Sequence, residues 1–203
     1  MIHIQDFTFN SFQTRCSVVW DDSLSCAIVD PGCSSDAEIS ELTSFISSRD
    51  LKPVCIMLTH GHFDHVLGVA DLVSRYDNLP VYMHPADKAT LAGNEYFTKW
   101  FGAPLPASFE TVDICETCSA EGCTDGPSEG CTDGPDGPKC ISVIEVGGLR
   151  FNVIETPGHT PGGVSFYEPA EKVLFSGDSL FAGAIGRTDH PGGDYEMLMK
   201  SIL

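Results

Sequence analysis

Residues 54–65 read Val54-Cys55-Ile56-Met57-Leu58-Thr59-His60-Gly61-His62-Phe63-Asp64-His65, an apolar run that ends in a cluster of histidines. A continuous apolar run with polar flanks predicts a strand that is buried on both faces. Imidazole nitrogens and carboxylate oxygens are ligands that zinc and iron take from proteins. In a tight loop at the strand end, His60 and His62 can point to one side while Asp64 and His65 turn toward a second point. The stretch therefore predicts a site that supplies ligands to two metal ions.

Two downstream turns fit the same site. His159 lies in Thr156-Pro157-Gly158-His159-Thr160-Pro161-Gly162-Gly163, shortly after a predicted strand over residues 149–154. The glycines and prolines favour a sharp turn that presents the histidine. Asp178 lies in Phe175-Ser176-Gly177-Asp178, just after another apolar strand. A carboxylate at that position, with one oxygen for each metal, would form a bridge.

Helix and strand patterns alternate along the rest of the chain. Alternating or continuous apolar segments predict strands over residues 2–12, 16–20, 26–29, 81–84, 142–146, 149–154, 164–167 and 173–175. Helical spacing predicts helices over residues 36–48, 66–73 and 86–101, the last interrupted at Gly93, and a final helix from Asp194. This order predicts an α/β fold whose sheets are covered by helices. The 203 residues have the size of a single domain, residues 1–203.

A segment of different composition separates the two halves, at about residues 115–140. It is rich in Gly, Pro, Cys and acidic residues, and residues 121–127 are repeated as residues 129–135. Such a composition cannot bury a core, so it predicts an exposed, flexible insert. The alternative is an additional zinc site, because Cys115 and Cys118 have zinc-knuckle spacing, with further candidate ligands at Cys123, Cys131 and Cys140.

Charge and cysteine content narrow the class of protein. The formal net charge is −18 and the 11 Lys and Arg are scattered, which argues against a nucleic-acid partner. No apolar run reaches membrane-spanning length, and the first residues lack the pattern of a secretion signal, so we expect a cytoplasmic protein without a membrane partner. The nine cysteines are then expected to be reduced thiols or metal ligands. The oligomeric state is left open.

In their order along the chain, the HxHxDH loop, the TPGHTPG turn and the GD turn resemble the metallo-β-lactamase superfamily. The segments 177–181 and 186–194 (GDSLF and GRTDHPGGD) are similar to its small, single-domain glyoxalase II-like hydrolases, of the hydroxyacylglutathione hydrolase kind. The resemblance implies an αββα sandwich with the metals at one sheet edge, and it assigns Asp30 a supporting role. The resemblance implies that one metal is bound by His60, His62 and His159. The other metal would be bound by Asp64 and His65, and Asp178 would bridge the two.

The resemblance is incomplete at the C-terminus. The family pattern continues with another strand and a GHG-type turn whose histidine completes the second metal site, whereas this chain ends at Ser201-Ile202-Leu203. Relative to that pattern the fold is C-terminally truncated. Three explanations are open: a truncated gene product, a weaker second site, or a substitute ligand, for which His84 and His190 are the candidates.

The resemblance implies a hydrolase of thioesters such as acyl-glutathione, in which Asp64 and Asp178 hold a metal-bound hydroxide that attacks the carbonyl. One or two zinc ions are the expected cofactor, with iron or manganese as alternatives. Arg187 would bind a carboxylate of the small-molecule substrate or brace its loop against Asp189. Two other hypotheses are a mononuclear iron enzyme like the persulfide dioxygenases, which share the fold and the GRTD segment, and a truncated metal-binding domain without activity.

Overall fold

The N-terminal strands follow the alternation of apolar and polar residues. The computed structural model describes residues 1–77, 79–115, 133–134, 137–138 and 142–203. In β1 (His3–Phe9), partly buried and exposed side chains alternate up to the buried Phe9. β1 pairs antiparallel with β2 (Thr14–Trp20), and β2 pairs antiparallel with β3 (Ser25–Val29). The strands predicted over residues 2–12, 16–20 and 26–29 are therefore present as an antiparallel meander. The meander forms one half of the larger sheet, which has the strand order β1-β2-β3-β4-β5-β6.

From β3 onward the larger sheet is parallel. β3 is followed by β4 (Lys52–Met57), β5 (Val81–Met83) and β6 (Val112–Asp113), each parallel to its neighbour. Parallel neighbours require crossover connections. The crossovers contain α1 (Asp36–Ser48), α2 (Phe63–Val66), α3 (Val69–Arg75), the 3-10 helix η1 (Pro85–Asp87), α4 (Lys88–Ala92) and α5 (Asn94–Phe101). The carboxyl ends of β3, β4 and β5 consequently meet at one edge of the sheet.

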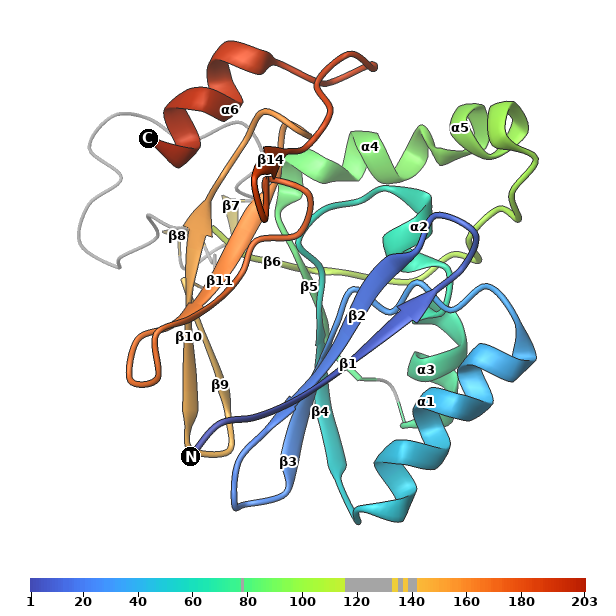
Figure 1. The fold of residues 1–203 in the computed structure, drawn as a ribbon, viewed down its shortest axis with the longest axis vertical. Coiled ribbons are helices and arrows are strands. Elements are labelled where there is room, and N and C mark those ends of the chain that lie inside the picture. Colours follow the sequence, from blue (N-terminus) through green and yellow to red (C-terminus); the bar gives the residue numbers. More distant parts are fainter. Residues whose placement is uncertain (78, 116–132, 135–136, 139–141) are drawn as a thin grey trace.

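Helices α1 and α3 lie on the face of the larger sheet that points away from the second sheet (Figure 1). Ser35 caps α1, because its side chain accepts a hydrogen bond from the backbone N–H of Glu38. Apolar side chains of both helices share one core with those of the sheet, among them Ile39, Leu42, Ile46, Val69, Leu72, Ile28 and Ile56.

The helix predicted over residues 66–73 is divided in the structure. α2 ends at Val66 and α3 begins at Val69, with Gly68 between them. A Cβ atom at Gly68 would lie 2.9 Å from the carbonyl oxygen of Pro31 and 2.9 Å from the Cβ of Cys33. The chain therefore bends where Gly68 packs directly on the turn that follows β3, a contact that helical periodicity does not reveal.

The second sheet is antiparallel and packs against the inner face of the first. Its strand order is β12-β11-β10-β9, with bounds β9 (Val143–Val146), β10 (Leu149–Glu155), β11 (Val164–Glu168) and β12 (Val173–Phe175). The core between the sheets includes Val29 and Met57 from the first sheet and Phe151 and Phe166 from the second. Phe151 and Phe166 are fully buried. The predicted mixed α/β architecture is confirmed.

Helix α6 (Tyr195–Ile202) begins where the sequence predicts it, after the capping residue Asp194. Leu198 of this helix is buried and lies so close to Gly158 that a Cβ atom there would be 2.5 Å from the Leu198 Cβ. α6 therefore packs on the turn that carries His159, at the upper end of the second sheet in Figure 1. None of the helices in the described ranges has both the length and the apolar surface needed to cross a membrane.

The described residues contain two short strand pairs, and one of them lies in the insert. β7 (Asp133–Gly134) pairs with β8 (Gly137–Pro138), and β13 (Leu180–Phe181) pairs with β14 (Ala184–Ile185). Cys115 is buried and forms no disulfide with another cysteine of the described ranges. The other cysteines of the insert, Cys118, Cys123, Cys131 and Cys140, lie outside the described residues, so the flexible insert and the additional zinc site both stay predictions.

Candidate metal centre

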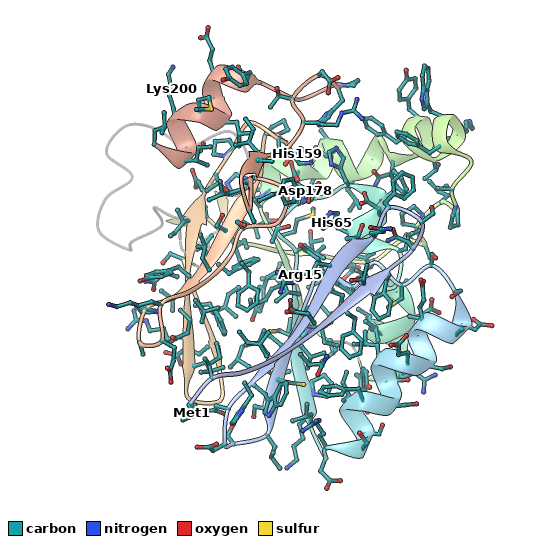
Figure 2. The ribbon with its side chains drawn as sticks, viewed as in Figure 1. Met1, Arg15, His65, His159, Asp178 and Lys200 are labelled. Carbon is teal, nitrogen blue, oxygen red and sulfur yellow. The ribbon has the colours of Figure 1, made fainter. Side chains whose placement is uncertain are left out.

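The candidate ligands gather at the edge where β4 and β12 end. His60 and His62 follow β4, Asp178 follows β12, and His159 lies in the turn between β10 and β11. In Figure 2, the side chains of His65, His159 and Asp178 lie near one another at the upper ends of the strands. The fold thus brings together side chains from segments that are far apart in the sequence.

His60, His62 and His159 form a first donor group. One ring nitrogen of each lies within 4.8 Å of the others, and all three residues are buried. His62 Nδ1 and His159 Nε2 are 3.0 Å apart. In a tetrahedral zinc site with bonds of about 2.0 Å, neighbouring ligand atoms are roughly 3.3 Å apart, so this separation suits two ligands of one ion.

A backbone carbonyl determines which nitrogen of His159 carries the proton. His159 Nδ1 lies 2.7 Å from the carbonyl oxygen of Arg187. Since a carbonyl oxygen only accepts hydrogen bonds, Nδ1 is the donor and Nε2 keeps its lone pair. His159 Nε2, which accepts a hydrogen bond from His62 Nδ1 in the metal-free protein, therefore carries the lone pair that can coordinate an ion.

The side chain of Arg187 turns toward its own loop. Its Nε lies 2.9 Å from Asp189 Oδ1, and 70% of the side chain is exposed. This contact corresponds to the bracing role that the sequence suggested for Arg187. The substrate-binding role stays a prediction.

Asp30 and Thr59 orient His60 in a comparable way. The buried carboxylate of Asp30 accepts hydrogen bonds from the backbone N–H of Thr59 (2.8 Å) and from its hydroxyl group (2.6 Å). Because the hydroxyl proton of Thr59 is committed to Asp30, its oxygen accepts from His60 Nδ1 at 3.0 Å. His60 Nε2 is buried and has no hydrogen-bond partner among the described residues. A buried, unpaired lone pair is costly unless a ligand uses it, so this atom fits a cation.

His60, His65 and Asp178 form a second donor group, also with ligand atoms within 4.8 Å of one another. His65 Nε2 lies 3.4 Å from Asp178 Oδ1, and His159 Nε2 lies 3.6 Å from Asp178 Oδ2. The two carboxylate oxygens therefore face histidines of different donor groups. This is the arrangement that a bridging carboxylate requires.

Asp64 lies beside the second group and is held by the β1–β2 hairpin. Its Oδ2 is 3.6 Å from His65 Nε2 and accepts a hydrogen bond from Thr14 Oγ1 at 2.7 Å. Asn10 Nδ2 donates to the backbone carbonyl of Asp64 at 2.9 Å. Sequence reasoning missed Asn10 and Thr14, since nothing in the sequence pairs a hairpin turn with a loop so far along the chain.

Burial keeps the histidines of the first group neutral. Burial and the neighbouring imidazoles lower the pKa of His60 well below its usual value, and they lower the pKa of His62 to about 2. Burial also lowers the pKa of His159, although Asp178 opposes the shift. Neutral imidazole is the form that coordinates metals. These residues can therefore bind an ion at neutral pH without first losing a proton.

The second group carries a proton that an ion would replace. Burial alone would lower the pKa of His65, but the charges of Asp64 and Asp30 and a hydrogen bond with Asp178 raise it well above its usual value. Burial alone would raise the pKa of Asp178, but the hydrogen bond and charge of His65 lower it to about 2. In the absence of a cation, this group is thus an imidazolium among carboxylates.

His84 and His190 are the candidates for a substitute ligand, and the structure places each beside different side chains. The ring centroid of His190 lies 4.9 Å from that of His62 and 5.0 Å from that of His159, on the side of the first donor group. His84 Nε2 lies 3.5 Å from Glu155 Oε1. Among the described residues, neither histidine is part of the two donor groups, and the role of a substitute ligand stays a prediction.

A cavity of about 530 Å³ opens beside the second donor group. Its walls come from the β1–β2 hairpin, from α2 and from the segment β12–β13, and they include Phe12, Arg15, Asp64, His65, Asp178 and Phe181. A cavity of this size can admit a small molecule.

Comparisons with known proteins agree with this geometry. A model of the metallo-beta-lactamase superfamily matches residues 10–203. Hydroxyacylglutathione hydrolase GloC of Haemophilus influenzae is 33% identical over 201 residues, which cover 99% of this chain and 82% of that protein. The probable metallo-hydrolase YqgX of Bacillus subtilis is 35% identical over 178 residues, which cover 87% of this chain and 71% of that protein.

A solved structure with a similar fold also supports membership of this superfamily. The structure of TTHA1623 in a di-iron-bound form has a TM-score of 0.73 and 30% sequence identity, covering 98% of this chain and 83% of that chain. The family and fold that the sequence motifs predict are therefore confirmed. This chain belongs to the metallo-β-lactamase superfamily.

Proposed function

We propose that the protein is a metal-dependent hydrolase of thioesters, with acyl-glutathione as the substrate class. The observation that carries the metal dependence is that one ring nitrogen each of His60, His62 and His159 lies within 4.8 Å of the others. In addition, the buried Nε2 of His60 has no hydrogen-bond partner in the part of the chain that the structure describes. The similarity to a hydroxyacylglutathione hydrolase supports the class of substrate.

The residues of the two donor groups would hold a pair of ions. His60, His62 and His159 would hold one ion, Asp64 and His65 would hold the other, and Asp178 would lie between them. When bound, divalent ions polarise a carbonyl group and increase the acidity of a water molecule. Zinc is the expected metal, with iron or manganese as alternatives, since a similar structure was solved in a di-iron-bound form.

The protein's own groups prepare the site for this chemistry. The Arg187 carbonyl and the Thr59 hydroxyl direct the lone pairs of His159 and His60 toward the ion position. Thr14 holds the carboxylate of Asp64 at the wall of the cavity. In this proposal the cavity admits the acyl group, and the exposed guanidinium group of Arg187 binds a carboxylate of the substrate.

We expect the purified protein to contain divalent metal and to release thiol from a hydroxyacyl-glutathione thioester. Removal of the metal with a chelator should lower the rate by about 100-fold or more, because the metals supply several kcal/mol of transition-state stabilisation. Elemental analysis and a thiol-release assay measure both properties, and restored activity on adding Zn²⁺ is the control for damage by the chelator. A metal-loaded protein that releases no thiol would contradict the proposal.

A persulfide dioxygenase would behave differently in the same samples. It would contain iron and consume oxygen with a persulfide substrate, without hydrolysing the thioester. The presence of donor atoms on both sides of Asp178 favours a pair of ions and hence the hydrolase.

The affinity for the ion held by Asp64 and His65, the second ion, should rise with pH. The affinity for the ion held by His60, His62 and His159, the first ion, should change little near neutrality. His65 has a pKa well above 6.5 in the metal-free protein, so an ion must displace its proton. Affinity for the second ion should therefore rise about tenfold per pH unit until the pH reaches that raised pKa.

The stability that protonated His65 gives to the metal-free protein is fully present below pH 6.5 and is lost as pH rises through the raised pKa.

Calorimetric titration with Zn²⁺ in two buffers of different ionisation enthalpy measures the protons released. Release of about one proton is expected when the second ion binds at neutral pH, and none from the first donor group. Binding of the second ion without release of a proton would show that the charge state assigned to His65 is wrong.

A further inference from the structure

The carboxylate of Asp87, which neither donor group contains, connects the two loops that carry the first donor group. Asp87 ends η1 and is fully buried. Its Oδ2 accepts hydrogen bonds from the backbone N–H of Gly61 (2.7 Å) and from Thr160 Oγ1 (2.9 Å). Its Oδ1 accepts from the backbone N–H of Gly162 (2.8 Å) and from Thr90 Oγ1 (3.1 Å). Gly61 separates His60 from His62, and Thr160 directly follows His159.

A second buried side chain completes the attachment of Gly61. Asn94, at the start of α5, donates from Nδ2 to the carbonyl oxygen of Gly61 at 2.9 Å. Both polar backbone atoms of Gly61 are therefore bound by side chains of the β5–β6 crossover. The contact leaves no space for a side chain, because a Cβ atom at Gly61 would lie 2.9 Å from the carbonyl oxygen of Asp87.

We propose that Asp87 is a positioning residue, which sets the affinity of the first donor group by fixing the His60-Gly61-His62 turn relative to the His159 turn. The proposal rests on the proposed function, since it assumes that this group binds an ion. The separation that matters is the 3.0 Å between His62 Nδ1 and His159 Nε2, one atom from each loop. A carboxylate suits this role because all of its lone pairs accept, and the surrounding groups from Gly61, Thr160 and Gly162 all donate.

Asp87→Asn tests the role with little change in volume. The amide nitrogen of asparagine cannot accept, so it would face a backbone N–H or a hydroxyl donor and push one loop away. Substitution of residues that orient metal ligands weakens metal binding by about 10–100-fold, and we expect a loss of that size for Zn²⁺. Competition with a chelating dye gives the dissociation constant. The visible spectrum of the Co²⁺-loaded protein reports the ligand geometry and should shift.

Asp113→Asn is the matched control. Asp113 lies on the neighbouring strand β6 and is largely buried, but it pairs with Lys88 rather than with either loop. Its substitution should change the Zn²⁺ dissociation constant by less than about threefold. If Asp87 served only the stability of the fold, Asp87→Asn would lower the melting temperature of the metal-free protein but bind Zn²⁺ as tightly as the wild type, and that result would overturn the proposal.

A second pair of variants covers the case in which Asp87→Asn does not fold. Thr160→Val and Thr90→Val each remove one hydroxyl donor to Asp87, but only Thr160 belongs to the loop of His159. Thr160→Val should weaken Zn²⁺ binding several-fold more than Thr90→Val, and equal effects would overturn the proposal. If the wild-type protein binds no divalent ion, the proposed function itself is wrong. If the wild-type protein binds Zn²⁺ and the variants bind it equally well, only the role proposed for Asp87 is wrong.

Discussion

Replacing Asp178 with asparagine is expected to lower kcat/KM for thioester hydrolysis by on the order of 10³-fold, or roughly 4 kcal/mol of transition-state stabilisation. The two oxygens of Asp178 face His65 and His159, at 3.4 and 3.6 Å. Asparagine offers one neutral oxygen, and its amide group places N–H donors where the other ligand atom was. The side chain of the variant therefore cannot bridge two ions. It also lacks the negative charge that offsets the positive charge of protonated His65.

Measuring the metal content together with the kinetics distinguishes the loss of the bridging ligand from a general loss of folded protein. The variant should retain at most one tightly bound ion per chain, whereas Asp71→Asn should match the wild type. Asp71 is exposed on α3, outside both donor groups, so it tests the same chemical change away from the site. If Asp178→Asn keeps both the metal content and the activity of the wild type, the bridging role assigned to Asp178 is wrong.

The candidate ligands can be identified from the sequence because each follows a strand that is itself recognisable. The buried run before His60 predicts β4, and the apolar residues before Asp178 predict β12. Strand ends in a layered α/β fold meet at one edge, so polar residues there are brought together whatever their distance in the sequence. The family could be identified from the sequence because the motifs that contain these residues resemble those of the superfamily, whereas the neighbours of each side chain could not be identified.

The groups that position the ligands depend on tertiary contacts that local sequence does not encode. Asp87 looks like an ordinary residue in the first turn of a helix, yet it is fully buried between the His60 and His159 loops. The Arg187 group that orients His159 is a backbone carbonyl, which any residue could supply. His190 could not be placed either, because the path of the loop after β14 decides that it packs against His62 rather than His65.

Gly177 controls the site through packing, and Gly177→Ala is expected to destabilise the protein by about 2–5 kcal/mol and to weaken metal binding at least about tenfold. Gly177 has a left-handed φ of +50°, which costs alanine about 1–2 kcal/mol. An added Cβ would also lie only 2.6 Å from the Cβ of Thr59. Thr59 is buried and cannot move away freely, and it holds both Asp30 and His60. Thermal unfolding of the metal-free protein and Zn²⁺ titration measure the two effects.

Gly183→Ala separates the packing effect from the backbone strain. Gly183 also has a positive φ, +80°, but nothing lies within 4 Å of a Cβ atom built there. Its substitution should therefore cost only about 1–2 kcal/mol of stability and leave Zn²⁺ affinity unchanged. The difference between the two variants isolates the contact between Gly177 and Thr59. Equal losses of stability and affinity would mean that backbone strain alone explains both, and that Thr59 does not transmit the packing of the Asp178 turn to His60.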